Sequence, residues 1–445
     1  MLAGYSLTAL AIALGGLVSS LGAQPTLVGH WEGQMVRDGS SVAVVFDFSA
    51  ADSARTATFR GTFGAPSMRA QGIPLSNISV TASAIAWDLR GDFTTSRFRG
   101  TLTGDQIVGQ VEDRDWRGTF ELRRAGVPAP LYRAEEVQFM NADVSLSGTL
   151  LLPTNRRAHS AVLFTHGAGA EGRHANRFIA EHFARRGIAA LIYDKRGVGK
   201  STGDWRSSDF DDLSADALAG IHFLKRRKEI HPRHIGLLGH SQGGTIAPLI
   251  ASRSSDVAFV ISEASAAVPM WVGEVHSLRT QVIAKGVSGA DLAQADTLID
   301  HFVNYARTGE GWDALVAAHE RGRATAWYRL LTPPPRTNYF WSFYRRIADY
   351  NASEHWAKVT VPTLVVQAER DEYVPVAQSI PLIDAALRKA GNRDYTIIVL
   401  PRASHSFSVS PAPGEPFAWP QYSPGYADLL VAWIALRAQP ASGAP

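Results

Sequence analysis

The chain has 445 residues, of which 45% are hydrophobic and 19% are charged. One hydrophobic core rarely grows beyond roughly 250–300 residues, so this length favours two folded units, and the composition excludes a disordered, collagen-like or polytopic membrane protein. The 44 basic and 41 acidic side chains give a net charge of +3. This charge is too small to attract the phosphates of a nucleic acid over the whole protein surface, so we expect no nucleic-acid partner. The absence of cysteine excludes disulfides, a thiolate nucleophile and cysteine-ligated zinc.

The N-terminus has the pattern of an export signal. Residues Leu7 to Leu21 are apolar, and Gly22-Ala23 supplies small residues for cleavage, although the first basic residue is Arg37 and the usual positive start is missing. We expect a signal peptide over residues 1–23, a secreted or periplasmic chain, and no stable membrane insertion after the signal is removed. An uncleaved anchor is the alternative, but the run is short for a bilayer that needs roughly 20 residues.

Short alternating runs dominate residues 24–125, for example residues 42–48, 78–80 and 106–111, and Gly- or Asp-containing turns separate them. The string Arg-Gly-Thr-Phe occurs at residues 60–63 and again at 117–120. This pattern predicts a small all-β accessory domain, either a barrel or a sandwich, whose ligand the sequence does not reveal.

A Gly- and Pro-containing connector at residues 125–130 leads into a second domain, predicted over residues 126–445. There, apolar runs alternate with helical stretches at residues 175–186 and 211–227. This alternation predicts an α/β domain with a mostly parallel sheet covered by helices on both faces. The predicted strand runs are residues 161–164, 189–193, 235–238, 258–261, 363–366 and 396–400.

The strand pattern stops between about residues 267 and 356, where a helical stretch rich in Trp, Tyr and Phe intervenes. We expect this stretch to form a helical cap over the sheet. Most of its aromatic side chains are expected to form the core of the cap itself.

The motif Gly239-His240-Ser241-Gln242-Gly243 directly follows one predicted strand and precedes a helix. This is the setting of a nucleophile elbow, in which the glycines permit a tight strand-to-helix turn and the turn exposes the serine hydroxyl. The helix N-terminus then points its amides at the reaction centre. Ser241 is therefore the predicted nucleophile.

A serine nucleophile needs an imidazole base and a carboxylate that orients the imidazole. In proteins with a nucleophile elbow of this kind, the three residues follow along the chain in the order Ser, Asp or Glu, His. Asp371 lies just past the strand run at 363–366, and His405 lies past the run at 396–400. We predict Asp371 as the acid and His405 as the base. The alternative acids are Glu369, Glu372 and, after an earlier strand, Glu263.

The predicted oxyanion hole consists of two backbone N–H groups. The loop His166-Gly167-Ala168 follows the first strand run and supplies one, from Ala168 with Gly167 as the alternative, and Gln242 supplies the other. His166 is expected to brace this loop and not to act as a base.

Two other patterns are discounted. Residues 197–201 imitate a phosphate loop, but the leading glycine of that pattern would fall on Asp194, whose carboxylate repels phosphate. Glu229, His231 and His234 loosely resemble metal ligands, but Pro232 interrupts the helical spacing that would converge them. We predict neither a metal nor a cofactor.

The motifs around residues 165–167, 193–197, 239–244 and 404–405 together resemble those of α/β-hydrolases, over about residues 134 to 436. Within that superfamily the chain is similar to secreted bacterial carboxylesterases grouped with serine aminopeptidase-like hydrolases. The resemblance implies acyl transfer through an acyl-enzyme on Ser241, without a cofactor, and a small-molecule ester as substrate. The alternatives are a peptidase or aminopeptidase with the same triad, and a non-catalytic carbohydrate- or lipid-binding protein. Acyl-chain length and oligomeric state stay open.

Overall fold

A computed structural model of the chain describes residues 26–50, 59–91, 94–127, 131–154, 158–325, 327–412 and 414–438. The predicted signal peptide over residues 1–23 and residues 128–130 of the connector lie outside these ranges. No helix within them is long and apolar enough to cross a membrane.

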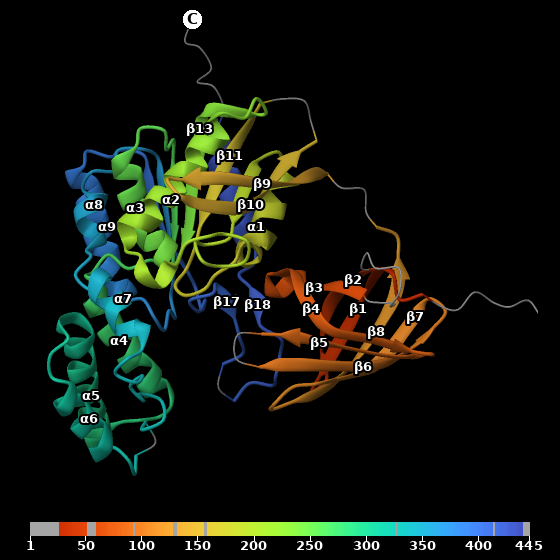
Figure 1. The fold of residues 1–445 in the computed structure, drawn as a ribbon, viewed down its shortest axis with the longest axis horizontal. Coiled ribbons are helices and arrows are strands. Elements are labelled where there is room, and N and C mark those ends of the chain that lie inside the picture. The colour runs from red at the N-terminus through yellow and green to blue at the C-terminus, as the bar shows by residue number, and fades with distance from the viewer. Residues whose placement is uncertain are drawn as a thin grey trace, which may run out of the picture.

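The N-terminal part is a closed antiparallel barrel of eight strands in which each strand pairs with the next and β8 returns to β1 (Figure 1). Alternate side chains point inward because successive residues of a strand face opposite sides. Large aromatic rings, including Trp31, Phe46, Trp87, Phe98 and Phe120, pack against one another in the interior. The strands are β1 (Gly29–Arg37), β2 (Ser40–Ala50), β3 (Phe59–Ala65), β4 (Ala70–Thr81), β5 (Ala84–Arg90), β6 (Thr95–Thr103), β7 (Gln106–Glu112) and β8 (Arg117–Ala125).

The second part is built on a sheet of eight strands in the order β16-β15-β14-β13-β11-β12-β10-β9. The strands from β16 to β12 run parallel, whereas β9 and β10 form an antiparallel hairpin at the other edge, which the sequence reasoning did not include. The strands are β9 (Tyr132–Asn141), β10 (Val144–Pro153), β11 (His159–Thr165), β12 (Ala189–Tyr193), β13 (Ile230–His240), β14 (Val260–Glu263), β15 (Thr363–Ala368) and β16 (Tyr395–Leu400).

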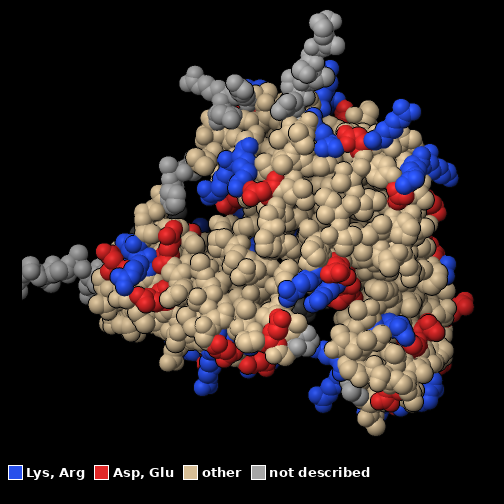
Figure 2. Space-filling view, turned by 180° about the vertical axis from the view of Figure 1, so that it is seen from behind, with Lys and Arg blue, Asp and Glu red and all other residues tan. Residues whose placement is uncertain are grey.

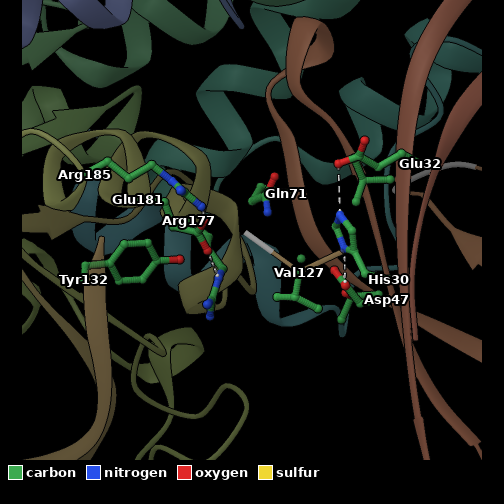
Figure 3. A pocket seen from close by; sticks show the side chains of 12 residues that line it. His30, Glu32, Asp47, Gln71, Val127, Tyr132, Arg177, Glu181 and Arg185 are labelled. Carbon is green, nitrogen blue, oxygen red and sulfur yellow. Dashed lines mark hydrogen bonds and ion pairs between the residues drawn. The ribbon is translucent and has the colours of Figure 1, made fainter. Parts of the chain in front are cut away.

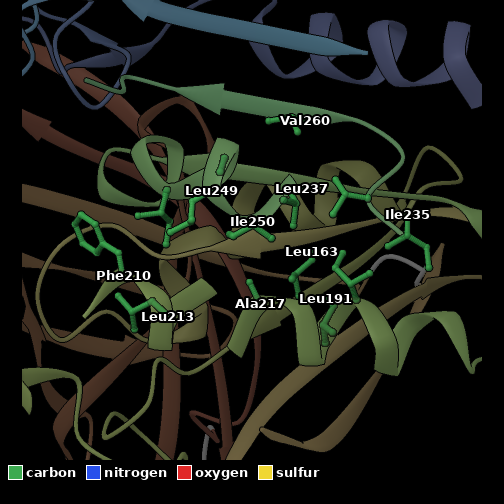
Figure 4. Packing of buried hydrophobic residues seen from close by; sticks show 14 of the residues in the cluster. Leu163, Leu191, Phe210, Leu213, Ala217, Ile235, Leu237, Leu249, Ile250 and Val260 are labelled. Carbon is green, nitrogen blue, oxygen red and sulfur yellow. The ribbon is translucent and has the colours of Figure 1, made fainter. Parts of the chain in front are cut away.

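Helices cover both faces of this sheet. One face packs against α2 (Phe210–Lys225), α3 (Gln242–Arg253), α8 (Ala352–Trp356) and α9 (Val376–Lys389), and the other against α1 (Arg177–Ala184) and α10 (Tyr426–Ala438). Figure 4 shows how Leu163, Leu191 and Leu237 of the strands meet Ala217 and Leu249 of the helices. The predicted α/β architecture with a helix-covered, mostly parallel sheet is confirmed.

Helices α4 to α7 leave the sheet between β14 and β15 and form a separate bundle (Figure 1). Its core is aromatic, with Trp327 and Trp341 buried against aliphatic side chains, so most of the ring-bearing residues pack within the bundle. Phe343 is an exception because it packs into the core of the sheet. The helices are α4 (Met270–Ala284), α5 (Gly289–Thr308), α6 (Trp312–Arg321) and α7 (Tyr339–Ile347).

The barrel is in contact with the α/β part through the short hairpin β17 (Ser408–Val409) and β18 (Gln421–Tyr422), which lies between them in Figure 1. Trp419, between these strands, enters the barrel core and donates its indole N–H to the carbonyl of Ser40 at 3.1 Å. The Arg37 guanidinium lies 4.1 Å from the centre of the Phe417 ring. Away from this hairpin, a cavity of about 490 Å³ lies between the barrel and the α/β part. Barrel residues such as His30 line one side of it, and Arg177 and Glu181 of α1 line the other (Figure 3).

Candidate active site

Ser241 stands between β13 and α3 in an unusual backbone conformation. Its φ of 57° and ψ of −120° are costly for a residue with a side chain, on the order of 1–3 kcal/mol, and such strain concentrates at functional sites. The turn is tight enough that a Cβ atom at Gly239 would lie 2.3 Å from the carbonyl carbon of Gly243. The glycines therefore permit the turn that places the serine hydroxyl above the end of the sheet.

The structure brings the three residues predicted as nucleophile, base and acid together. His405 Nε2 lies 2.9 Å from Ser241 Oγ, and His405 Nδ1 lies 2.9 Å from both carboxylate oxygens of Asp371. The Asp371 side chain is buried and also accepts the backbone N–H groups of Tyr373 and Val374, each at 2.9 Å. These bonds fix the direction of the carboxylate toward the imidazole.

The other acidic candidates have different partners. Glu369 accepts the N–H of Arg402 at 2.6 Å, and Glu372 accepts the backbone N–H of His405 at 3.1 Å. Glu263 is fully buried, accepts the hydroxyl of Tyr426 and lies 3.6 Å from His240 Nδ1. Among these four carboxylates, Asp371 is the one aligned with the His405 ring.

The predicted oxyanion loop follows β11 and is held from both sides. The N–H of Gly167 donates to the carboxylate of Glu171, so of the two predicted loop donors, Ala168 and Gly167, the second is already engaged. The buried Lys195 donates from Nζ to the carbonyls of Gly167 and Gly169, the latter at 2.8 Å. Gln242 begins α3, where backbone N–H groups have no partner within the helix.

His166 has the bracing environment that the sequence predicted. Its Nε2 lies 2.6 Å from the carbonyl of Tyr193, and its ring packs edge-on against the Tyr193 ring. Burial, together with the nearby charge of Lys195, lowers the pKa of His166 to about 3. The ring is therefore neutral at physiological pH and is occupied in holding the loop.

The stretch after β12 is a structural loop built around Asp194. The Asp194 carboxylate binds the guanidinium of Arg173 and the backbone N–H of Lys200, and Ser201 Oγ donates to the Asp194 carbonyl. A Cβ atom at Gly199 would lie 2.4 Å from that carboxylate, so the glycine allows the loop to close around it. The carboxylate occupies the centre of the loop, where a phosphate would have to sit.

Sequence reasoning missed Lys195 and Glu171 as parts of this site. Lys195 belongs to the Tyr193–Gly197 stretch that was assigned a structural role, and its contacts with the oxyanion loop depend on the pairing of β11 with β12. Of the discounted residues, Glu229 directly precedes β13, and His231 and His234 lie near its start. Contrary to the spacing argument, the two imidazoles stack 3.9 Å apart, because this segment is extended and not helical, while Glu229 pairs with Arg227.

Several known proteins are similar to parts of the chain. A non-heme chloroperoxidase of Burkholderia pyrrocinia is 26% identical over 211 residues, which are 46% of this chain and 70% of that protein. A quorum-quenching protein of Acinetobacter baumannii is 32% identical over 129 residues, 29% of this chain and 42% of that protein. An uncharacterized peptidase of Bacillus subtilis is 22% identical over 295 residues, 63% of this chain and 36% of that protein. The chain thus spans less than half the length of the last two relatives.

Solved structures with a similar arrangement include an esterase of Pyrococcus furiosus, with a TM-score of 0.42 and 17% identity over 64% of this chain and 88% of that one. Est1E of Butyrivibrio proteoclasticus, solved with ferulic acid, has a TM-score of 0.42 and 17% identity over 67% of this chain and 96% of its own. The sequence profile of the serine aminopeptidase S33 family matches residues 156–410, more than half of the chain. The chain therefore belongs to the serine aminopeptidase S33 family of α/β-hydrolases.

Proposed function

We propose that the chain hydrolyses carboxylic esters, with Ser241 as nucleophile, His405 as general base and Asp371 as the residue that orients the base. The observation that carries the proposal is the continuous chain of contacts from Ser241 Oγ through the His405 ring to Asp371, each step 2.9 Å long. Membership of a hydrolase family agrees with it.

In the proposed reaction, His405 Nε2 takes the hydroxyl proton as Ser241 Oγ attacks the ester carbonyl. The negative charge that develops on the carbonyl oxygen is stabilised by the N–H groups of Gln242 and Ala168. The alkoxide then leaves with the proton from His405, and an acyl group stays on Ser241. Water, activated by the same imidazole, releases the acid and restores the serine.

The substrate pocket is proposed to lie between the sheet and the helical cap. Apolar side chains gather beside the Asp371 loop, where Val374 packs with Val268 and with Val272 of α4. The surface is hollowed between the barrel and the cap bundle, and charges of both signs are mixed over this face (Figure 2). An apolar lining of this kind suits the acyl group of a small or medium ester.

The test is covalent labelling with a fluorophosphonate, followed by sequencing of the modified peptide. We expect label on Ser241, and we expect Ser241→Ala to lose turnover of a short-chain nitrophenyl ester by roughly 10⁶-fold. Ser83→Ala, in an exposed barrel turn, is the matched control and keeps wild-type turnover. Label on another residue, or near-normal turnover in Ser241→Ala, would overturn the proposal.

Cleavage of amides by the same triad is the second candidate, favoured by the aminopeptidase description of the family and by the relative named as a peptidase. Turnover of short-chain nitrophenyl esters should be compared with that of aminoacyl nitroanilides. Faster amide cleavage would reverse the order of the two candidates.

We also propose that the mature chain is exported, on the support of the apolar run from Leu7 to Leu21 and the small residues after it. Mass spectrometry of the N-terminus is the measurement. A chain that begins near Gln24 is expected, and an intact Met1 in the periplasmic fraction would contradict cleavage.

A further inference from the structure

The turn that carries His405 runs directly into the β17–β18 hairpin. The N–H of Phe407 donates to the carbonyl of Ser404 at 2.8 Å and closes this turn, and the N–H of Ser404 donates to the carbonyl of Ser408 in β17 at 2.9 Å. Phe407 has a φ of 59°, which is costly for a residue with a side chain and persists only where the surroundings hold it. The position of His405 therefore depends on the contacts that hold Phe407 and β17.

The return strand of the hairpin holds the last residue of this turn. Ser423, directly after β18, donates both its N–H and its hydroxyl to the carbonyl of Phe407, at 2.9 and 3.0 Å. Antiparallel pairing of β17 with β18 joins the two strands of the hairpin. The Phe407 ring is fully buried, with its centre 5.0 Å from that of Tyr426. A shift of β18 would therefore move the backbone of Phe407, two residues after His405.

The other end of β18 is anchored in the barrel. Trp419, two residues before β18, is 8% exposed and belongs to the hydrophobic core of the barrel. Its indole N–H donates to the carbonyl of Ser40 at 3.1 Å, and its ring meets that of Trp116 edge-on with the centres 5.5 Å apart. The Arg37 guanidinium lies 4.1 Å from the centre of the Phe417 ring and 5.3 Å from that of Trp116. Three segments of the barrel thus hold this one segment of the α/β part.

We infer that Trp419 is a positioning residue of the active site, through which the barrel fixes the β17–β18 hairpin and with it the turn that carries His405. This inference rests on the proposed function of Ser241 and His405. A catalytic group must be held within about 0.5 Å of its productive position, and a misplacement of about 1 Å can cost roughly 100-fold in rate. Because the anchor acts on the base and not on the substrate pocket, its loss lowers kcat and leaves KM nearly unchanged.

The experiment compares Trp419→Ala, Trp419→Phe and Trp31→Ala in the full chain with a short-chain nitrophenyl ester, at a temperature where each variant is folded by circular dichroism. Trp419→Ala is expected to lower kcat about tenfold with KM changed less than about twofold. Trp419→Phe keeps an aromatic ring against Trp116 and is expected to stay within about threefold of the wild type. An unchanged kcat in Trp419→Ala, or a loss that appears in KM alone, would overturn the inference.

Trp31→Ala is the matched control for a loss of barrel stability. Trp31 is fully buried in the same core, and its indole N–H also donates to a backbone carbonyl, that of Leu27 at 2.9 Å. Trp31 pairs with Arg124 near the end of β8, whereas Trp419 contacts Trp116 just before that strand begins. Trp31→Ala is therefore expected to lower the melting temperature at least as much as Trp419→Ala, but to keep kcat within about twofold of the wild type. Equal losses of kcat in the two variants would count against a positioning role and overturn the inference.

A double variant tests whether Trp419 and Ser423 act through the same hairpin. Ser423→Ala removes the hydroxyl that donates to the Phe407 carbonyl but keeps the backbone N–H, and we expect kcat to fall about threefold. The double variant W419A/S423A is expected to lose about as much as Trp419→Ala alone, because a released hairpin no longer holds Phe407. Losses that multiply to about thirtyfold would show independent effects and overturn the inference.

Amide hydrogen exchange reports on the turn independently of any substrate. Exchange over residues 404–409 is expected to be faster in Trp419→Ala than in the wild type, and unchanged in Trp31→Ala. Equal exchange in all three chains would overturn this inference alone. A wild-type chain that neither reacts with a fluorophosphonate nor turns over the ester would instead overturn the proposed function, so the two failures are distinguishable.

Two milder variants serve if a tryptophan variant does not fold. Phe417→Ala then replaces Trp419→Ala, because the Phe417 ring contacts both Arg37 and Trp419. Ile107→Val replaces Trp31→Ala, because Ile107 is fully buried in the barrel core on β7. A fall in kcat of about threefold that is confined to Phe417→Ala would support the inference, and equal kcat values in the two variants would overturn it.

Discussion

At the scale of single residues, the direction of the Asp371 carboxylate decides which nitrogen of the His405 ring carries the proton. Asp371 contacts Nδ1 with both oxygens, so Nδ1 carries the proton and Nε2 is left free to accept one from Ser241. Two backbone N–H groups hold Asp371 in this position. Asn has nearly the same shape but can also donate a hydrogen bond, and it would stabilise the wrong tautomer.

Asp371→Asn is therefore expected to lower kcat by roughly 10⁴-fold while the chain keeps its thermal stability within a few degrees. Steady-state kinetics with a nitrophenyl ester and a thermal melt measure the two effects. Glu369→Gln, a nearby exposed carboxylate that binds the Arg402 N–H, is the control and should change kcat less than about twofold. A similar loss in both variants would remove Asp371 from its proposed role.

Lys195 donates to the carbonyls of Gly167 and Gly169 in the predicted oxyanion loop, and Lys195→Met deletes both of these hydrogen bonds. We expect kcat to fall roughly 10- to 100-fold with a small change in KM, because the loop donor acts on charge that develops in the transition state. Lys200→Met, an exposed lysine five residues on, is the comparison. A change in KM alone would show that Lys195 acts in substrate binding.

At the scale of elements, the strand–turn–helix unit around Ser241 was predictable from local sequence. The glycines, the preceding apolar run and the small residues that follow all favour one backbone path. The order of Asp371 and His405 after later strands was predictable because parallel strands end at one edge of the sheet. The contacts of Lys195 and Glu263 were not predictable, since each joins segments that are far apart in the chain and that no local pattern relates.

The tight turn around Ser241 should make the stability of the chain sensitive to a single added methyl group. Gly239→Ala places a Cβ atom 2.3 Å from backbone of Gly243, which cannot move without shifting α3, so we expect a loss of about 3 kcal/mol in the free energy of unfolding. Gly273→Ala in α4 meets nothing within 4 Å and should instead stabilise the chain by about 0.5–1 kcal/mol. Denaturant unfolding measures both. Equal effects at the two glycines would contradict the tight-turn argument.

At the scale of the whole molecule, the interior of the barrel is filled by packed side chains and leaves no room there for a ligand. Aromatic rings such as Trp87 and Phe98 stack 5.4 Å apart in its interior, and Trp419 from the α/β part packs with this core. A closed barrel also has no free strand edge. The alternating runs of the sequence predicted short strands, but the closure of β8 on β1 and the insertion of Trp419 depend on long-range contacts.

The wall of the barrel that faces the interdomain cavity carries a titratable group. His30 lies 2.6 Å from Asp47 and 3.1 Å from Glu32 (Figure 3). Burial alone would lower the pKa of His30, but the hydrogen bonds and charges of the two carboxylates outweigh it and raise the pKa above the ordinary value of about 6.5. The folded chain therefore holds this proton more tightly than the unfolded chain, so its stabilisation is present below about pH 6.5 and is lost as the pH rises through the folded pKa.

His30→Gln should consequently lower the melting temperature more at pH 5.5 than at pH 8.5, measured by thermal unfolding of both chains in matched buffers. His182 on α1 gives a control of opposite sign, because burial and the charge of Arg186 lower the pKa of His182 despite its contact with Asp428. His182→Gln should therefore cost more stability at pH 8.5 than at pH 5.5. The same pH trend in both variants would show that the carboxylates on the barrel wall do not stabilise a charged His30.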